Sequence, residues 1–372
     1  MAMLVVVAIA AAAWVTLAGG SADRQPPATG PESSAEKHAS RAAKLSVAEL
    51  AGQRLVTGFA GGSPPDRVRR MISQGNLAGV ILFDENLGTR RHARKLIRQL
   101  QAIKRPAGLR SPLLVMIDQE GGLVKRLSGP PSASAEEMGR RGRRYSRRQG
   151  IETARNLKDV GVNTDLAPVL DVGRPGSAIR AQHRSFGRTA KRVADTAVPF
   201  GLALQGRGVA ATGKHFPGLG AAKQDTDFAV QKVKLSRREL RRVDERPYVP
   251  YARRSRLGLV MLSTAIYTHF SHRPAAFTRK IATGELRHHV GFAGVSITDA
   301  LQTTSAAHFG GPAKVGVAAA KAGADLLLYT DGGAAARAGH ALRERLRKGK
   351  LERGRFERSV NRVLRLRAKL GK

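Results

Sequence analysis

The chain has no cysteine and is short of acidic residues. Without cysteine, a disulfide, a thiolate metal site and a thiol nucleophile are excluded. Its 28 Asp and Glu residues stand against 65 Lys and Arg, and the formal net charge of +37 predicts polyanionic surroundings. No zinc-finger motif, RNP-type motif or basic strand interleaved with aromatic residues occurs, so nucleic acid is not an expected partner. An anionic cell envelope, or a proteome rich in arginine, accounts for the charge more simply.

Histidine spacing typical of a metal site is also missing. No two histidines are spaced i, i+4 as on a zinc-binding helix, and His288 and His289 are adjacent, so they point to different sides of any regular element. We therefore expect no metal and no cofactor.

The first 44 residues read as a targeting segment and a tether. Residues 3–19 form an apolar run that is short for a membrane span of about 20 residues. Small residues follow it, which predicts a secretory signal peptide over residues 1–20. An uncleaved signal-anchor is the alternative and would be the only membrane contact. Residues 21–44 predict a disordered linker. In either case the folded domain, 45–372, is expected outside the cytoplasm.

Short apolar runs alternate with amphipathic segments from residue 45 onward. The pattern predicts a single α/β domain with the (β/α)8 TIM-barrel fold. A doubly wound sheet is the alternative, but no Gly-x-Gly-x-x-Gly opens a helix after the first run. The amphipathic segments include 92–104, 147–160 and 313–322, and a basic helix over 352–369 is expected to close the barrel. The predicted strands are 55–59, 79–83, 113–118, 162–169, 209–215, 259–263, 294–299 and 325–329.

Polar residues follow several of these runs directly. Asp118 ends the third run, Lys214 and His215 end the fifth, and Asp299 ends the seventh. Asp165 and Asp171 bracket the end of the fourth. In a TIM barrel the carboxyl ends of the strands meet at one mouth, where active sites lie. The sequence therefore predicts a site formed by these side chains.

The segment KHFPGLG at 214–220, followed by Asp225-Thr226-Asp227, resembles a known signature. It is similar to KHFPGxG…DSH of glycoside hydrolase family 3, in the branch of bacterial β-N-acetylglucosaminidases that consist of the barrel domain alone. The chain departs from this signature where the family's final His is Asp227. Matches in the same order extend over essentially the whole predicted barrel, so the resemblance implies the family's barrel and activity.

Other motifs extend the resemblance to residues that bind the sugar in the family. Asp118 and Arg126 lie in a stretch similar to DQEGGxVxRL, and Arg184 lies in one similar to RSFG. By resemblance, these three residues together with Lys214 and His215 bind the substrate sugar. Carboxylates accept hydroxyl hydrogen bonds, and Arg presents a fixed fork of donors. A structural Asp118–Arg126 salt bridge and an interior, satisfied His215 are the alternatives.

Two further points stay open around these motifs. The stretch VNTDLAPVLDV at 162–172 also resembles the family, and its Asp165 and Asp171 either shape loops or contact the ligand. The paired Gly121 and Gly122 are expected to form a tight turn that brings Asp118 and Arg126 to one ligand.

The reacting groups are also implied by the resemblance. Asp299 lies in ITDAL, similar to the family's nucleophile motif, and would form a covalent glycosyl-enzyme as retaining glycosidases do. The family's acid/base is an Asp–His pair on a flexible loop. Here the corresponding pair is Asp225 and Asp227. Two neighbouring carboxylates raise the pKa of one of them, so Asp227 with Asp225 as its partner is the expected acid/base.

We therefore expect a retaining exo-β-N-acetylhexosaminidase that releases terminal β-linked N-acetylglucosamine from peptidoglycan fragments or chitooligosaccharides. Two alternatives remain. One is another exo-β-glycosidase of the same family, such as a β-glucosidase, although those typically take their acid/base from a second domain. The other is a catalytically impaired protein that binds cell-wall sugars, with a cationic surface that grips anionic polymers.

Overall fold

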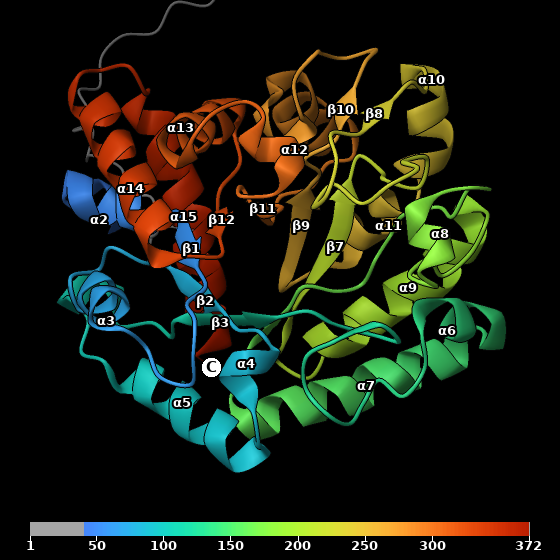
Figure 1. The fold of residues 1–372 in the computed structure, drawn as a ribbon, viewed down its shortest axis with the longest axis horizontal. Helices are drawn as coiled ribbons and strands as arrows, with labels where there is room; N and C mark the ends of the chain where they lie inside the picture. Colours follow the sequence, from blue (N-terminus) through green and yellow to red (C-terminus); the bar gives the residue numbers. More distant parts are fainter. Residues whose placement is uncertain (1–40, 372) are drawn as a thin grey trace, which may run out of the picture.

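Eight parallel strands form the centre of the protein, one from each predicted run (Figure 1). They pair in the order β11-β9-β7-β6-β3-β2-β1-β12. Ile297 of β11 forms a parallel bridge with Leu326, which nearly closes the sheet into a barrel. The TIM-like barrel predicted from the sequence is thus confirmed. The strands are β1 (Leu55–Thr57), β2 (Gly79–Ile81), β3 (Leu114–Ile117), β6 (Thr164–Asp165), β7 (Ala210–Phe216), β9 (Gly258–Leu262), β11 (Val295–Thr298) and β12 (Leu327–Tyr329).

The computed structural model describes residues 41–371. The predicted signal segment, 1–20, and most of the predicted linker lie outside the described residues. The last four residues of that linker, 41–44, are folded: Ala42 is buried, and its N–H donates to Asn361 Oδ1 at 3.3 Å. The ordered part of the chain thus begins before the predicted residue 45. Within the described range, no helix is long and apolar enough to cross a membrane.

Helices surround the barrel (Figure 1). The predicted amphipathic segments form α5, α7 and α13, and α7 begins four residues before its predicted start. The α-helices are α2 (Val47–Gly52), α3 (Asp66–Ser73), α4 (Asp84–Leu87), α5 (Arg90–Ala102), α6 (Ala135–Arg141), α7 (Arg143–Val160), α8 (Ala178–Ala181), α9 (Ala190–Gln205), α10 (Arg237–Glu239), α11 (Tyr248–Arg254), α12 (Thr304–Ala307), α13 (Pro312–Ala322), α14 (Gly332–Arg347) and α15 (Arg353–Leu370).

Shorter elements complete the fold. The strands β4 (Gln119–Gly121) and β5 (Val124–Lys125) form an antiparallel hairpin directly after β3, and β8 (Lys232–Val233) pairs with β10 (Ile266–Tyr267). The segments η2 (Leu240–Asp244) and η4 (Lys280–His289) are π-helical, whereas η1 (Ala107–Leu109) and η3 (Ala275–Phe277) are 3₁₀ turns.

The strands are apolar on both faces because each face is covered. Alternate residues such as Met116, Met261 and Ile297 pack in a cluster inside the barrel. Their chain neighbours, such as Val115 and Val260, belong to the larger cluster shared with the helices. Burial on both faces explains why the strands read as continuous apolar runs rather than as alternating ones.

Helix α15 closes the end of the barrel where the strands begin. Its Val363 and Leu366 join the apolar cluster inside the barrel. The fully buried Arg367 donates hydrogen bonds of 2.6–3.1 Å to carbonyl oxygens of the segment 109–112, which leads into β3. The basic helix expected to close the barrel therefore does so at this end, and the opposite mouth stays open for a site.

Asp325 fixes the same end of the barrel through a buried ion network. Its carboxylate accepts hydrogen bonds at 2.7 Å from both Arg287 of η4 and Arg362 of α15, and one at 2.9 Å from the N–H of Ser296 in β11. Burial opposes the charged form, but the two arginines outweigh it and hold the pKa of Asp325 well below its usual range. One carboxylate thus joins two strands and two helices.

We predict that Asp325→Ala lowers the free energy of unfolding by about 3–5 kcal/mol, because it leaves two partly buried guanidinium groups without their partner. Urea unfolding followed by circular dichroism measures this. Since the folded-state pKa of Asp325 is depressed, its contribution is present above the unfolded pKa of about 4 and is lost as pH falls further. As a control, Glu344→Ala removes two surface ion pairs, with Arg347 and Lys348, and should change stability by less than about 1 kcal/mol. Equal effects of the two substitutions would contradict the assignment.

Candidate active site

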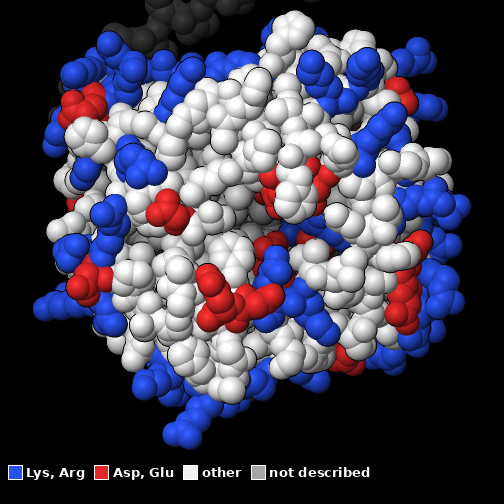
Figure 2. Space-filling model, viewed as in Figure 1, with Lys and Arg blue, Asp and Glu red and all other residues white. Residues whose placement is uncertain are grey.

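The predicted site residues converge on the carboxyl ends of the strands. Asp118 follows β3, Lys214 and His215 lie in the last residues of β7, and Asp299 follows β11. Figure 2 shows a face that is hollowed at its centre, with acidic side chains around the hollow and Lys and Arg spread over the periphery. The strongly basic surface therefore surrounds a centre of mixed charge.

A buried ion network forms the floor of the site. Lys214 Nζ lies 2.6 Å from Asp118 Oδ1 and 2.7 Å from Glu120 Oε1. Arg184 donates two hydrogen bonds of 2.9 Å to Glu120. Burial opposes the charges of Glu120 and Lys214, but Arg184 and Lys214 hold the pKa of Glu120 well below its usual range, and Asp118 and Glu120 raise the pKa of Lys214. Glu120 and Lys214 are therefore ionised, and the network offers a preformed array of donors and acceptors.

Glu120 is a site residue that the sequence analysis missed. It is 3% exposed and contacts both Lys214 and Arg184, two of the predicted sugar-binding residues. The signal was present, since Glu120 stands two positions after Asp118 in the same motif. The paired glycines after it have φ of +96° and +62°. A Cβ at Gly121 would lie 2.2 Å from the carbonyl oxygen of Ala133, so only glycine fits this turn.

Arg126 does not meet Asp118. Its guanidinium Nη1 lies 3.7 Å from Asp84 Oδ2, and the group stands 6.0 Å from the ring centre of Phe83. The Asp118–Arg126 salt bridge that the sequence left open is not formed. That the turn at the paired glycines brings both side chains to one ligand stays a prediction, and Arg126 is a sugar-binding residue by resemblance only.

His215 is oriented by Asp171. The imidazole Nδ1 lies 2.8 Å from Asp171 Oδ2, and Asp171 Oδ1 accepts the backbone N–H groups of His215 at 3.1 Å and Leu219 at 2.7 Å. Burial lowers the pKa of His215, but the charge and hydrogen bond of Asp171 outweigh it and raise that pKa. Asp165 accepts the N–H of Gln119 at 3.0 Å. Both aspartates therefore bind protein groups and shape the loops that carry ligand-facing residues.

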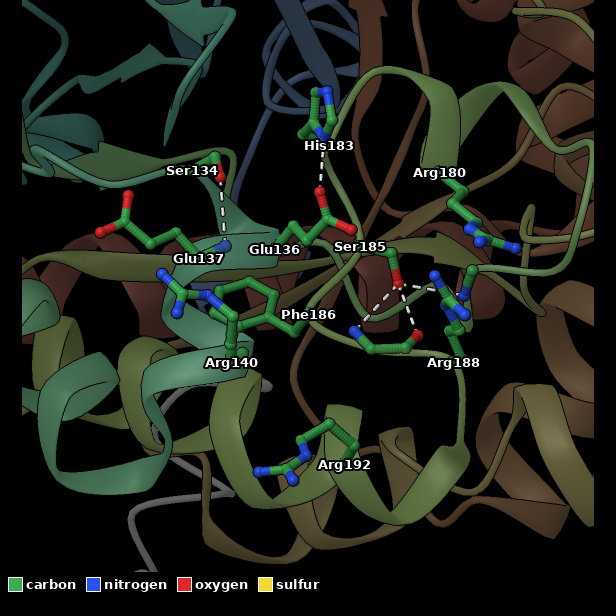
Figure 3. Close-up of a pocket in the computed structure, with 13 residues that line it drawn as sticks. Ser134, Glu136, Glu137, Arg140, Arg180, His183, Ser185, Phe186, Arg188 and Arg192 are labelled. Carbon is green, nitrogen blue, oxygen red and sulfur yellow. Dashed lines mark hydrogen bonds and ion pairs between the residues drawn. The ribbon is translucent and has the colours of Figure 1, made fainter.

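Ser185 ties the Arg184 loop to the Asp171 loop (Figure 3). Its Oγ accepts the N–H of Gly173 at 3.0 Å and lies 2.8 Å from the carbonyl oxygen of Asp171. A cavity of about 670 Å³ lies behind this loop, and basic side chains such as Arg180 and Arg192 line it. None of the predicted site residues lines this cavity. Ser185, which does line it, supports the loop that carries Arg184.

Asp299 follows β11 directly, at the carboxyl end of the strand, and is partly buried. Its Oδ1 accepts the N–H of Ala300 at 2.8 Å, and its own N–H donates to the carbonyl oxygen of Leu262 at 2.9 Å. Burial raises the pKa of Asp299, while the nearby positive charges of His215 and Lys214 counteract this. The carboxylate is therefore fixed by the backbone and held among cationic groups.

Asp225 and Asp227 approach Asp299 from the loop between β7 and β8. The N–H of Asp227 donates to Asp225 Oδ1 at 3.1 Å, and Asp225 Oδ2 lies 3.6 Å from Arg184. The N–H of Thr304 donates at 3.2 Å to the carbonyl oxygen of Asp227, which ties the loop to α12 behind Asp299. Partial burial and the negative charges of Asp299 and Asp225 raise the pKa of Asp227 to about 6. The two carboxyl groups, Asp227 and Asp299, therefore differ in their surroundings although they lie close to each other.

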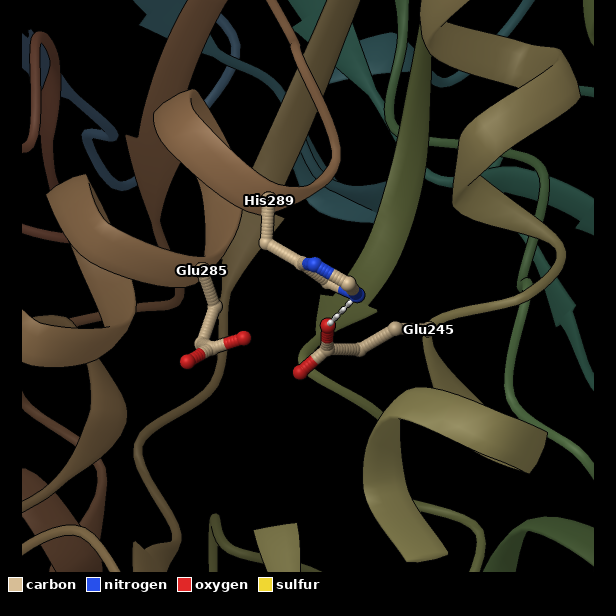
Figure 4. Close-up of side chains that lie close together, drawn as sticks. All are labelled: Glu245, Glu285 and His289. Carbon is tan, nitrogen blue, oxygen red and sulfur yellow. Dashed lines mark ion pairs between the residues drawn. The ribbon is translucent and has the colours of Figure 1, made fainter. Parts of the chain in front are cut away.

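Among the residues that the structure describes, one group of side chains has the composition of a metal site: Glu245, Glu285 and His289 (Figure 4). Glu285 and His289 are spaced i, i+4, a pattern that a search for histidine pairs overlooks. Arg241 donates two hydrogen bonds of 2.8 Å to Glu285, and His289 Nε2 lies 3.8 Å from Glu245 Oε2. Since Arg241 occupies both oxygens of Glu285, the group is an ion-pair network.

Glu245 is the member of this network whose charged form is least favourable. It is 1% exposed, and neither carboxylate oxygen has a hydrogen-bond partner in the described part of the chain. Burial, and after it the negative charge of Glu285, raises the pKa of Glu245 to about 8. The folded protein therefore favours the protonated carboxyl, and stability is lost as pH rises from the unfolded pKa of about 4.3 through about 8.

We predict that Glu245→Gln stabilises the protein by about 2 kcal/mol at pH 9 and by little at pH 4, because it removes a buried charge that exists only at the higher pH. Thermal unfolding at both pH values measures this. Glu85→Gln, at an exposed position, should change neither value. A stabilisation of equal size at the two pH values would contradict a raised pKa for Glu245.

Comparisons with known proteins agree with this arrangement. Residues 44–366 match the profile of "Glycosyl hydrolase family 3 N terminal domain". The "Uncharacterized secreted glycosyl hydrolase" of Arthroderma benhamiae is 37% identical over 344 residues, which cover 89% of this chain and 96% of that protein. The "Beta-hexosaminidase" of Thioalkalivibrio sulfidiphilus is 34% identical over 271 residues, 70% of this chain and 75% of that protein.

Solved structures show the same fold. The structure of a glycoside hydrolase family 3 beta-N-acetylglucosaminidase from a Paenibacillus species superposes with a TM-score of 0.83 at 31% identity. The match covers 88% of this chain and 63% of that chain, so the present chain spans less than two thirds of that protein.

Proposed function

The chain belongs to glycoside hydrolase family 3, and on that premise we propose that it is a retaining exo-β-N-acetylhexosaminidase. The substrate would carry a terminal β-linked N-acetylglucosamine, as in peptidoglycan fragments or chitooligosaccharides. The names of two relatives, a β-hexosaminidase and a β-N-acetylglucosaminidase, support this choice of sugar. The name of a third, a secreted glycosyl hydrolase, supports a site of action outside the cytoplasm.

In the proposed first step, the carboxylate of Asp299 attacks the anomeric carbon while the bond to the leaving oxygen breaks. The carboxylic acid of Asp227 gives its proton to that oxygen, and the aglycone departs as an alcohol. In the second step, Asp227 takes a proton from water, which attacks the anomeric carbon and releases Asp299 from the ester. Asp118, Lys214 and Arg184 would bind sugar hydroxyls, with His215 beside them and Arg126 at the rim.

One observation carries the proposal: two carboxyl groups lie close together in unlike surroundings. Asp299 is fixed by a backbone hydrogen bond near the charges of His215 and Lys214, which favour its anion. Asp227 has its pKa raised to about 6 by partial burial, Asp299 and Asp225. Burial raises the pKa of Asp299 too, so the two carboxyls interact as a pair. Within this pair the cations and the Ala300 N–H favour Asp299 as the anion, the role of a nucleophile, and leave Asp227 as the proton donor.

The strong positive charge is compatible with an anionic cell envelope. Lys and Arg cover the periphery of the face in Figure 2 and leave the central hollow to mixed charge. Anionic polymers would then contact the rim while the sugar end enters the mouth, and such contacts weaken as salt screens them.

We predict that Asp299→Asn abolishes turnover of aryl β-N-acetylglucosaminide, with a loss of at least about 10³-fold, because an amide cannot form the covalent intermediate. Initial rates measure the loss, and circular dichroism checks folding. Glu344→Gln, at a surface carboxylate of α14, should keep full activity. A folded Asp299→Asn variant with more than a few per cent of wild-type activity would refute the nucleophile assignment.

We predict that Asp227→Ala loses about 10²–10⁴-fold in rate on substrates with poor leaving groups, which need protonation. Aryl substrates with good leaving groups should suffer less in the first step, and added azide should rescue the second. In the wild type, kcat/KM for a disaccharide should fall about tenfold per pH unit above pH about 6, because the acid form of Asp227 is lost there. Asp227→His should keep or raise activity and shift this limb.

Three outcomes separate the alternatives. Unchanged rates on every substrate in Asp227→Ala would mean that the proton comes from another group. A wild type that is inert, together with an active Asp227→His variant, would show a catalytically impaired sugar-binding protein. A preference for aryl glucoside over aryl N-acetylglucosaminide would instead identify a β-glucosidase.

A further inference from the structure

A large apolar side chain stands in the solvent beside the proposed general acid. Phe228 is 80% exposed and directly follows Asp227. In the part of the chain that the structure describes, only one other large hydrophobic side chain, Leu123, is exposed. Phe228 belongs to neither apolar cluster of the core. Its ring therefore contributes nothing to the packing of the barrel.

The backbone holds this ring in place. The N–H groups of Phe228 and Ala229 both donate at 3.2 Å to the carbonyl oxygen of Asp225, which forms a turn. On the other side, the N–H groups of Thr304 and Ser305 donate at 3.2 Å to the carbonyl oxygens of Asp227 and Thr226. The loop is thus pinned both to itself and to α12, and the exposure of Phe228 results from a defined backbone conformation.

The chemistry of the site decides which part of a substrate the ring would meet. A general acid must lie within hydrogen-bond distance of the glycosidic oxygen. The sugar that reacts is held deeper, where Lys214 and His215 are 2% and 5% exposed. The residue that follows the acid and points into solvent therefore lies on the leaving-group side of the bond. At that position an exposed aromatic ring offers a flat apolar face.

We propose that Phe228 is a platform for the first ring of the leaving group, and that this leaving group is a pyranose sugar. The inference rests on the proposed function, because it takes Asp227 as the acid. The C–H face of a pyranose is apolar and packs on the face of an aromatic ring. A sugar aglycone gains this contact, whereas a small alcohol or an anion does not.

The test compares two substrates in four proteins. The substrates are diacetylchitobiose, which has a sugar as leaving group, and N-acetylglucosaminyl azide, which has no ring there. The proteins are the wild type, Phe228→Ala, Phe228→Leu and Phe228→Tyr. We expect Phe228→Ala and Phe228→Leu to raise KM for the disaccharide about 3- to 10-fold with little change in kcat. Phe228→Tyr should behave as the wild type, and the azide should react equally well in all four.

A KM for the disaccharide that is unchanged in Phe228→Ala would overturn the platform. So would equal losses on both substrates, which would show a general disturbance of the acid/base loop. If the wild type hydrolyses neither substrate, the proposed function fails, and calorimetry with non-reacting sugars decides the platform alone. In that case the disaccharide should bind the wild type more tightly than N-acetylglucosamine does, and Phe228→Ala should abolish the difference.

Discussion

Two carboxylates and two cations from three separate segments meet at the barrel mouth, and their formal charges cancel. Lys214 contacts Asp118 and Glu120, and Arg184 donates two hydrogen bonds to Glu120. Because these groups are largely buried, removing any one would leave an uncompensated charge in a poorly solvated place. The network therefore fixes the ends of β3 and β7 and the Arg184 loop relative to one another. Asp299, the proposed nucleophile, takes part of its electrostatic surroundings from the same Lys214, so its reactivity would depend on this network too.

The fold was predictable because the same pattern, an apolar run followed by a helical segment, recurs along the sequence. Eight apolar runs, with amphipathic segments between most of them, leave few architectures other than a barrel, and each run corresponds to one strand. The predicted boundaries were less accurate. Six strands are shorter than their runs, and β7 and β9 are shifted by one residue. In the fourth run, 162–169, only Thr164 and Asp165 form the strand. Apolar residues continue past the end of a strand when the following loop is itself buried. The start of the folded part was also placed too late, because one small buried residue, Ala42, gives no periodic signal.

The sequence predicted which residues lie at the mouth, but it did not predict which of them contact one another. Strand-end positions placed Asp118, Lys214 and Asp299 at one mouth, as the structure has them. The partners could not be read from the sequence, because spacing does not say which of several charges a side chain meets. Thus Glu120 was overlooked beside Asp118, and Arg126 turned out to lie against Asp84. The pairing of Asp171 with His215 joins positions 44 residues apart, which only the folded barrel brings together.

The surroundings of Asp227 explain how an aspartate could act where the family signature has a histidine. A lone, solvated carboxyl would be ionised at neutral pH and would make a poor acid. Here the loop holds Asp227 near Asp299 and Asp225, and partial burial together with these two like charges raises its pKa to about 6, near the value of an ordinary imidazole. On the proposed mechanism, burial and two neighbouring carboxylates thus give an aspartate about the proton affinity of the histidine in the family signature. Under that mechanism, such an acid depends on the ionisation of Asp299. Once Asp299 is esterified to the sugar, its negative charge disappears and the pKa of Asp227 falls. The fall keeps Asp227 in the deprotonated form that it needs as the general base of the second step.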